Sequence, residues 1–288
     1  MSEQAAVHVI GASGRSGQVL CRALLGRGTA VIPVIRNPGR WTATGLSGTL
    51  RIADLAGAGL EAALADAESI VSCAHARHIP AILAAAPAAR RFVFLGSTRK
   101  FTCWPDGHGD GVLAGEAAFH SSGRPGVLLH PTMIYGAPGE NNVQRLALLL
   151  KRLPIVPLPG GGCALVQPIH QSDLTRSILA ALDVGWAGPE SLVIAGSQAL
   201  PYADFVYAVA EAAGLPRPRM VAVPAALLLL ASPLTRLPGL PRIGVAEIRR
   251  LLEDKAFDIG PMQARLGIHP IALADGLART FAKAPTCP

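Results

Sequence analysis

Charged residues and long apolar runs are scarce in this sequence, and each scarcity excludes a class of protein. Only 16% of the residues are charged while 50% are hydrophobic, which excludes a disordered or fibrous chain. The most apolar stretch, around 221–230, is bounded by Pro224 and Pro233. It is far shorter than the roughly 20 residues that cross a bilayer. The polar start, 1–6, has no targeting signal, since a strand is expected from Val7 onward.

Paired cysteines and basic blocks are also lacking. The five cysteines are odd in number and never spaced as Cys-x-x-Cys, so we expect reduced thiols and a cytoplasmic location. The net charge of +7 comes from scattered arginines that do not alternate with aromatic residues, so we expect no nucleic-acid partner. Histidine, cysteine and aspartate occur nowhere at metal-ligand spacing, so we expect no metal site. The basic surface would attract a polyphosphate ligand.

The apolar segment around 221–234 has two interpretations. Its length is typical of a buried or interfacial helix. The alternative is peripheral membrane contact, or an interface with a partner protein.

What the sequence does contain is an alternation of apolar strands with helical patterns. A helix is predicted around 19–25 and another over 59–65, each between strands. The predicted strands are 7–10, 30–35, 50–53, 69–73, 91–95 and 126–129. This spacing is typical of βαβ units, and it predicts an α/β fold with a Rossmann-type, doubly wound parallel sheet.

Beyond Tyr135 the alternation is less regular and proline is frequent. We expect a Rossmann domain at 1–135 and a smaller C-terminal α/β substrate lobe at 136–288, packed on it with shared sheet elements. In the lobe, helices are predicted at 139–152, 173–182, 202–213 and 245–253, strands at 166–169 and 192–195, and a turn region at 153–162.

A glycine-rich motif follows the first strand and opens the first helix, which is the context that dinucleotide binding requires. Gly11 would allow a tight turn, Gly14 would let the backbone approach a pyrophosphate, and Gly17 would let the helix pack on the strand. Free amides at the helix start would face the phosphates. The candidate cofactor-binding residues here are Gly11, Ser13, Gly14, Arg15, Ser16 and Gly17.

The dinucleotide predicted by these residues is NADP(H) rather than NAD(H). Sites for NAD(H) usually place an acidic residue about 20 positions beyond the glycines, to bind the ribose 2′-hydroxyl. No acidic residue occurs between Glu3 and Asp54, and the second strand ends at Arg36. A guanidinium there, joined by Arg15 or Arg40, suits a 2′-phosphate.

Further motifs follow in order along the chain: Asp54-Leu55, Phe92 to Thr98, His130 to Gly136, and Gln167 to His170 leading to Asp173. With the glycine motif, they make the chain resemble the extended or atypical short-chain dehydrogenase/reductase superfamily. The likeness is to its NAD-dependent epimerase/dehydratase group, which acts on nucleotide sugars. His130 stands where that family has arginine in its Arg-Pro-x-x-x-Tyr-Gly element.

The resemblance implies a role for individual residues. Asp54 and Leu55 would contact the adenine, and Ala74 would lie along the dinucleotide. Pro131 to Met133 would flank the nicotinamide, and Ser97 matches the catalytic serine. His170 and Asp173 would be structural, and Tyr135 a packed residue at the sheet edge.

The family's catalytic Tyr-x-x-x-Lys pair is absent. It should fall on the helix before Glu116, where 108–115 contain neither residue, and no tyrosine of the chain has a lysine four positions on. We therefore expect a shortened helix between His108 and His120, with Ser97, Thr98 and Lys100 as candidate catalytic residues after the fifth strand. The alternative for Lys100, one of four lysines, is an exposed loop residue.

Two functions remain open on this evidence. One is an NADP(H)-dependent oxidoreductase, epimerase or dehydratase acting on a small or nucleotide-linked carbonyl or alcohol. The other is a non-catalytic NADP(H)-binding redox sensor or an accessory subunit, which the missing pair favours.

Overall fold

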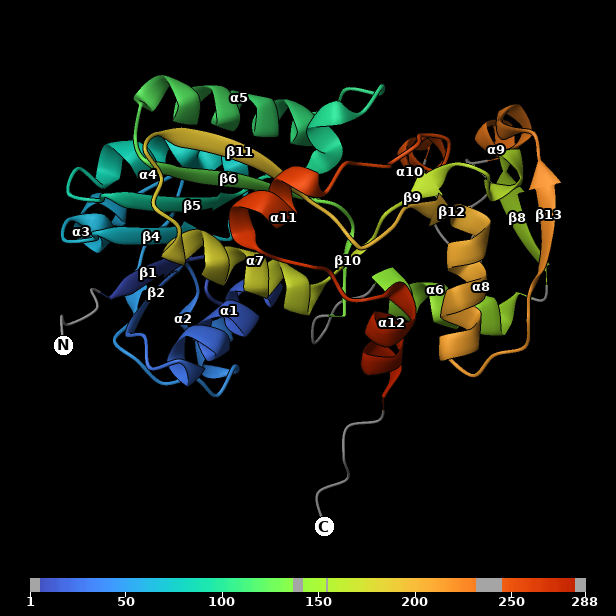
Figure 1. Cartoon of the computed structure of the whole chain (residues 1–288), viewed down its shortest axis with the longest axis horizontal. Coiled ribbons are helices and arrows are strands. Elements are labelled where there is room, and N and C mark those ends of the chain that lie inside the picture. Colours follow the sequence, from blue (N-terminus) through green and yellow to red (C-terminus); the bar gives the residue numbers. More distant parts are fainter. Residues whose placement is uncertain (1–5, 137–141, 154, 232–244, 283–288) are drawn as a thin grey trace, which may run out of the picture.

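The computed structural model describes residues 6–136, 142–153, 155–231 and 245–282 (Figure 1). Its core is a seven-stranded parallel sheet in the order β11-β6-β5-β4-β1-β2-β3. The strands are β1 (Val7–Ile10), β2 (Val31–Ile35), β3 (Arg51–Ile52), β4 (Ser69–Ser72), β5 (Arg91–Leu95), β6 (Gly126–Pro131) and β11 (Pro189–Ile194). The Rossmann-type sheet expected from the sequence is confirmed.

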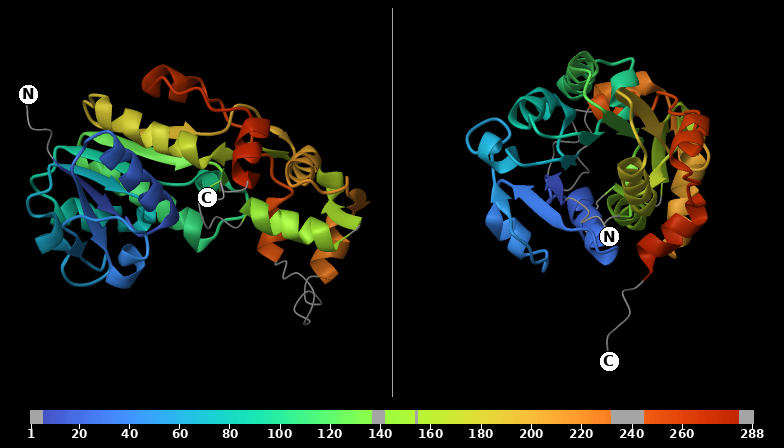
Figure 2. Two further views of the ribbon diagram at one scale, coloured as in Figure 1. Left: turned by 90° about the horizontal axis from the view of Figure 1, so that it is seen from below. Right: turned by 60° about the vertical axis from the view of Figure 1, so that its left-hand side comes forward.

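Helices cover both faces of this sheet, because alternate side chains of each strand point to opposite sides. In β5, Val93 and Leu95 join one apolar core while Phe92 and Phe94 join the other. The first core includes α1 (Arg15–Gly26), α7 (Gln171–Asp183) and α11 (Gly260–Leu266), and the second includes α3 (Leu60–Leu64), α4 (Ile79–Ala85) and α5 (Gly107–Ser122). Figures 1 and 2 show the two helical layers.

Helix α5 differs from the expectation of a shortened helix between His108 and His120. It has 16 residues and contains both histidines. Four of its residues are glycine, so the sequence shows no clear apolar helical pattern. The glycines instead let the backbone of α5 lie close to the neighbouring element. A Cβ on Gly115 would lie 2.1 Å from the carbonyl oxygen of Ala76 in the short helix η1 (Ala76–His78).

A smaller lobe lies beyond the carboxyl ends of the sheet strands, on the right in Figure 1. Its apolar core is formed mainly by α6 (Asn142–Arg152), α8 (Tyr202–Ala212), α12 (Leu273–Phe281) and the parallel pair β8 (Ile155–Pro159) and β13 (Arg219–Val223). Two-residue strands join it to the sheet: β7 (Ile134–Tyr135) pairs with β10 (Ile169–His170), and β9 (Leu165–Val166) pairs with β12 (Leu200–Pro201).

The lobe contains the larger departures from the expected elements. The predicted turn region 153–162 includes β8, and the predicted strand 166–169 is two separate two-residue strands. The segment 221–231 is the end of β13 followed by α9 (Ala225–Ala231), so a single buried helix is the wrong interpretation, and 232–234 lie outside the described residues. Neither α11 nor α12 was expected.

The second half of the chain also supplies α7 and β11 to the Rossmann sheet. The division into 1–135 and 136–288 therefore stays a prediction with shared sheet elements. No helix within the described ranges is both long and apolar enough to traverse a bilayer.

Candidate functional site

The glycine motif forms a tight turn between β1 and α1. Gly11 has φ +74°, a conformation that favours glycine, and its carbonyl accepts a hydrogen bond from the Gly14 amide at 2.9 Å. A Cβ on Gly17 would lie 2.3 Å from the same carbonyl oxygen, so only glycine fits there. Gln18 fixes the loop from inside the helix by donating to the Ser13 carbonyl at 3.0 Å. The loop is thus pre-formed, with backbone exposed at the start of α1.

Three arginines and a serine lie in the elements that follow β1 and β2. Arg15 is the first residue of α1 and is exposed. The Ser16 hydroxyl donates to Gln171 Oε1 at 3.1 Å, which ties α1 to the start of α7. Arg36 directly follows β2 and is exposed, as is Arg40 in α2 (Pro38–Thr42). Because β1 and β2 are adjacent and parallel, Arg36 and the glycine turn share one edge of the sheet.

The residues expected along the adenine and the dinucleotide lie at the same carboxyl edge. Asp54 and Leu55 follow β3, and the Asp54 carboxylate accepts a hydrogen bond from the Ala56 amide at 3.1 Å. An open hollow of about 720 Å³ is lined by residues 55–62 and by side chains of α4. Ala74 follows β4, and a Cβ on Gly11 would lie 3.4 Å from its backbone nitrogen.

The end of β6 supplies Pro131 and Met133 on either side of a buried threonine. Met133 packs against the core of the smaller lobe, so this segment lies where the lobe meets the sheet. The Thr132 hydroxyl is buried without a hydrogen-bond partner. Buried hydroxyls without a partner are uncommon in folded proteins, so Thr132 is an exception at the junction of the sheet and the smaller lobe.

The three candidate catalytic residues lie together after β5, in and just before the short helix η2 (Thr98–Phe101). The Ser97 hydroxyl caps η2 by accepting a hydrogen bond from the Arg99 amide at 3.2 Å. The Thr98 hydroxyl donates to the Pro131 carbonyl at 3.3 Å, which links the ends of β5 and β6. Lys100 turns away from solvent, with 12% of its side chain exposed.

Lys100 belongs to a buried cluster that sequence reasoning missed. Its Nζ donates to both carboxylate oxygens of Glu116 at 2.6 Å and lies 3.3 Å from His130 Nε2. His130 Nε2 is 3.2 Å from Glu116 Oε1. These residues come from η2, α5 and β6, so the cluster joins three elements beneath Ser97. A histidine directly after the apolar run of the predicted strand 126–129 was the available signal.

Burial and charge set the protonation states in this cluster. Burial, with the nearby Lys100 charge, lowers the pKa of His130 to about 4, so its imidazole is neutral at physiological pH. Burial alone would raise the pKa of Glu116, but hydrogen bonds from Lys100 and Ser191 and the charge of Lys100 lower it overall. Glu116 is therefore an anion that compensates the Lys100 ammonium.

Two histidines meet at the start of α5. The His75 and His108 rings lie edge to face with centroids 4.3 Å apart. His75 directly follows Ala74, and its Nδ1 accepts a hydrogen bond from the Arg77 amide, while its Nε2 is buried without a partner. Burial and the positive charges of neighbouring groups lower the pKa of His75 to about 4. Unpaired polar atoms thus occur after both β4 and β6.

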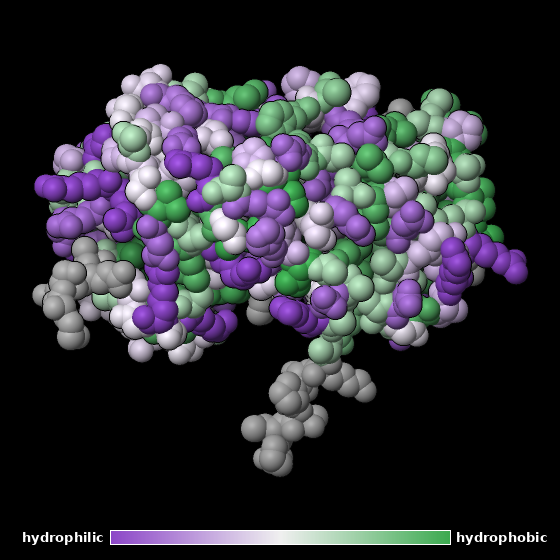
Figure 3. Space-filling model, in the orientation of Figure 1, coloured by the Kyte–Doolittle hydropathy of each residue, from purple (hydrophilic) through white to green (hydrophobic). Residues whose placement is uncertain are grey.

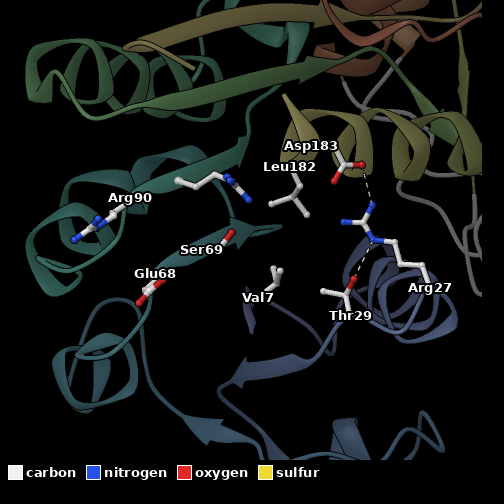
Figure 4. A pocket seen from close by; sticks show the side chains of 9 residues that line it. Val7, Arg27, Thr29, Glu68, Ser69, Arg90, Leu182 and Asp183 are labelled. Carbon is white, nitrogen blue, oxygen red and sulfur yellow. Dashed lines mark hydrogen bonds and ion pairs between the residues drawn. The ribbon is translucent and has the colours of Figure 1, made fainter. Parts of the chain in front are cut away.

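A partly open pocket of about 340 Å³ lies at the opposite, amino edge of the sheet (Figure 4). Val7 and Ser69 begin their strands there, and Arg27 pairs with Asp183 at 3.0 Å beside them. The glycine turn and Ser97 follow the carboxyl ends of strands, so this cavity is separate from the candidate cofactor site. Within the described residues there is no group of three or more potential metal ligands.

A doubly wound sheet with a glycine turn after β1 defines the Rossmann class of dinucleotide-binding folds. No protein-family model matches this chain, and no curated protein does. Solved structures do match over nearly its whole length.

UDP-glucuronic acid 4-epimerase from Bacillus cereus, in complex with UDP-glucuronic acid and NAD, is 17% identical with a TM-score of 0.73, covering 96% of this chain and 98% of its own. NADPH-dependent quinone oxidoreductase QOR2 from Escherichia coli, complexed with NADPH, is 18% identical with a TM-score of 0.75 over 96% and 99%. MoeE5 in complex with UDP-glucose and NAD is 21% identical with a TM-score of 0.70 over 96% and 97%. These matches show that the chain has the same fold as these NAD- and NADPH-bound proteins.

Proposed function

We propose that this protein binds NADP(H) and is an oxidoreductase, epimerase or dehydratase acting on a small or nucleotide-linked carbonyl or alcohol. The observation that carries the proposal is the glycine turn, in which a Cβ on Gly17 would meet the Gly11 carbonyl oxygen at 2.3 Å. Structures with this fold hold NAD or NADPH, and two of them hold a nucleotide sugar.

The turn and the adjoining strand ends fit such a cofactor. Backbone amides at the start of α1, with Ser13 and Ser16 nearby, would bind the pyrophosphate. Arg36, with Arg15 or Arg40, would bind the 2′-phosphate, which is the basis for NADP(H) over NAD(H). The remaining proposed contacts are Asp54 and Leu55 to the adenine, Ala74 to the dinucleotide, and Pro131 and Met133 to the nicotinamide.

The bound nicotinamide would supply the hydride chemistry, and the chain would place the substrate and move a proton. Because the Ser97 hydroxyl accepts its hydrogen bond from Arg99, its proton is free to be donated to a substrate oxygen. Thr98 would hold the ends of β5 and β6 in register through the Pro131 carbonyl. Lys100 would hold η2 against α5 through its hydrogen bond to Glu116.

The smaller lobe, at 136–288 in our proposed division, would determine which substrate binds. That lobe adjoins Met133, so a substrate held there lies against the nicotinamide position. A cytoplasmic location is part of the proposal, since none of the four described cysteines is in a disulfide.

One observation favours the alternative of a non-catalytic NADP(H)-binding sensor or accessory subunit. Lys100 is committed to the Glu116 carboxylate on both oxygens, so it is not presented to a substrate. The Tyr-x-x-x-Lys pair of the family that the sequence resembles is also absent, so the site has fewer proton-transfer groups than that resemblance implies.

Activity measurements separate the two functions. Purified protein with NADPH is given a panel of aldehydes, ketones, quinones and nucleotide-sugar carbonyls while NADPH absorbance is followed. Nucleotide sugars are also incubated with the protein and NADP+, and the products are separated by chromatography, because epimerisation and dehydration consume no net cofactor. We expect turnover with one class, and an at least tenfold lower kcat for Ser97→Ala, a loss typical of a proton-transfer group. Ser47→Ala, on an exposed loop, is the matched control. Tight NADPH binding without turnover would instead establish the sensor.

A further inference from the structure

One end of the smaller lobe exposes an apolar surface that no described residue covers. This lobe tip consists of the outward side chains of β8, β13 and α9: Ile155, Pro157, Val221, Leu227 and Leu230. Leu227 is 56% exposed and Leu230 is 77% exposed, and Ile155 and Val221 are each about half exposed. Apolar side chains gathered in this way on a surface are typical of docking sites.

The backbone explains why these side chains face outward together. In β8, Val156 and Leu158 enter the core of the lobe, so Ile155 and Pro157 point to the opposite face. Parallel pairing places Val221 beside Pro157 on that face. Leu227 and Leu230 are three positions apart and therefore share one side of α9, which follows β13 after Pro224.

Basic side chains border the tip at one edge. The parallel strands begin side by side, with Ile155 opposite Arg219, and α6 ends at Lys151 and Arg152 shortly before β8. Arg217 comes just before β13 and stacks on the ring of Tyr207. Residues 142–159 and 214–231 include no aspartate or glutamate. Figure 3 shows hydrophobic residues at the upper right, over α9 and β13, with strongly hydrophilic side chains projecting below them.

We propose that the lobe tip docks the protein on a membrane surface that contains anionic phospholipids. The leucines of α9 and the outer face of β8–β13 would enter the interfacial region, and the four basic residues would contact lipid phosphates. A second copy of the chain fits the charge less well, because a twofold dimer through this face would bring two basic edges together. The inference is independent of the proposed function, since it uses no residue of the cofactor site.

Vesicle binding tests the proposal directly. The full chain is co-sedimented with vesicles of phosphatidylcholine alone and of phosphatidylcholine with phosphatidylglycerol. We expect binding that requires the anionic lipid and weakens as salt is raised. Replacing Lys151 and Arg152 by glutamine should weaken it about thirtyfold, since each surface charge near an anionic membrane contributes a factor of about five. Leu227→Asp with Leu230→Asp should weaken it at least about tenfold.

The control is Leu113→Asp on α5, an apolar residue that is 48% exposed on the other domain. It should bind vesicles as the unchanged protein does, and thermal unfolding verifies that each variant is folded. Equal binding to both vesicle types, or no binding to either, overturns the proposal. A dimer in light scattering that Leu227→Asp dissociates, without vesicle binding, would assign the tip to a second copy instead.

Discussion

At the scale of single residues, the least predictable feature is the Lys100–Glu116–His130 cluster. The sequence placed Lys100 near the catalytic serine position, but not its partners, because Glu116 and His130 are 16 and 30 positions away. Which distant side chains meet depends on sheet order and helix position. By contrast, the roles expected of Gly11 and Gly17 in the turn follow from local sterics, and the structure has that geometry.

His130 should make stability depend on pH. Its pKa is 6.5 in an ordinary environment and about 4 in the fold, so between these values the unfolded chain binds more protons. The free energy of unfolding should therefore rise with pH across this window, by at most about 3 kcal/mol from this residue. Urea unfolding at several pH values should show a shallower rise for His130→Gln than for the unchanged protein. An identical pH dependence would contradict the buried, neutral assignment.

Arg36 should determine which dinucleotide binds. A charge-assisted contact to a 2′-phosphate contributes about 1.5–3 kcal/mol, so Arg36→Ala should weaken NADPH binding about tenfold to hundredfold. NADH binding should change little, because it has no 2′-phosphate. Calorimetric titration with both nucleotides measures this, and Arg90→Ala at the amino edge of the sheet is the control. Equal affinity for NADPH and NADH in the unchanged protein would remove the NADP(H) assignment.

At the scale of elements, the strands with long apolar runs were predicted well. Elements that are rich in glycine or only two residues long were predicted poorly. The expected strands 7–10 and 91–95 coincide with β1 and β5, since apolar residues predominate in each. Helix α5 was expected to be short because 108–115 lack the Tyr-x-x-x-Lys pair, yet it runs over Gly107–Ser122. Two-residue strands such as β7 depend on pairing between distant segments, which no local pattern contains.

The close contact of α5 with η1 predicts an unusual effect of alanine. Alanine favours helices over glycine by about 1 kcal/mol, yet Gly115→Ala should destabilise the protein by about 2 kcal/mol or more. The added methyl group would lie 2.1 Å from the Ala76 carbonyl oxygen. Gly107→Ala in the same helix has no atom within 4 Å of its Cβ and should be neutral or slightly stabilising. Urea unfolding compares the two, and equal stability would contradict the packing.

At the scale of the whole molecule, the chain crosses repeatedly between the sheet and the smaller lobe. After β6 it enters the lobe, returns as α7, and enters again after β11. The amphipathic patterns predicted a βαβ domain followed by a less regular lobe. They did not predict the interleaving, because nothing in the sequence of β11 shows that this short apolar segment joins the main sheet. An interleaved chain cannot easily unfold one part alone.

Cofactor binding should therefore stabilise the two parts together. A ligand at about 100 times its Kd that binds only the folded chain adds about 2.7 kcal/mol. For a chain of this size, that raises the melting temperature by roughly 5–10 °C. Because α7 and β11 join the lobe to the sheet that holds the glycine turn, saturating NADPH should shift one unfolding transition seen by circular dichroism and by calorimetry alike. A second calorimetric transition whose temperature NADPH does not change would contradict this prediction. It would mean that the lobe unfolds independently of the sheet.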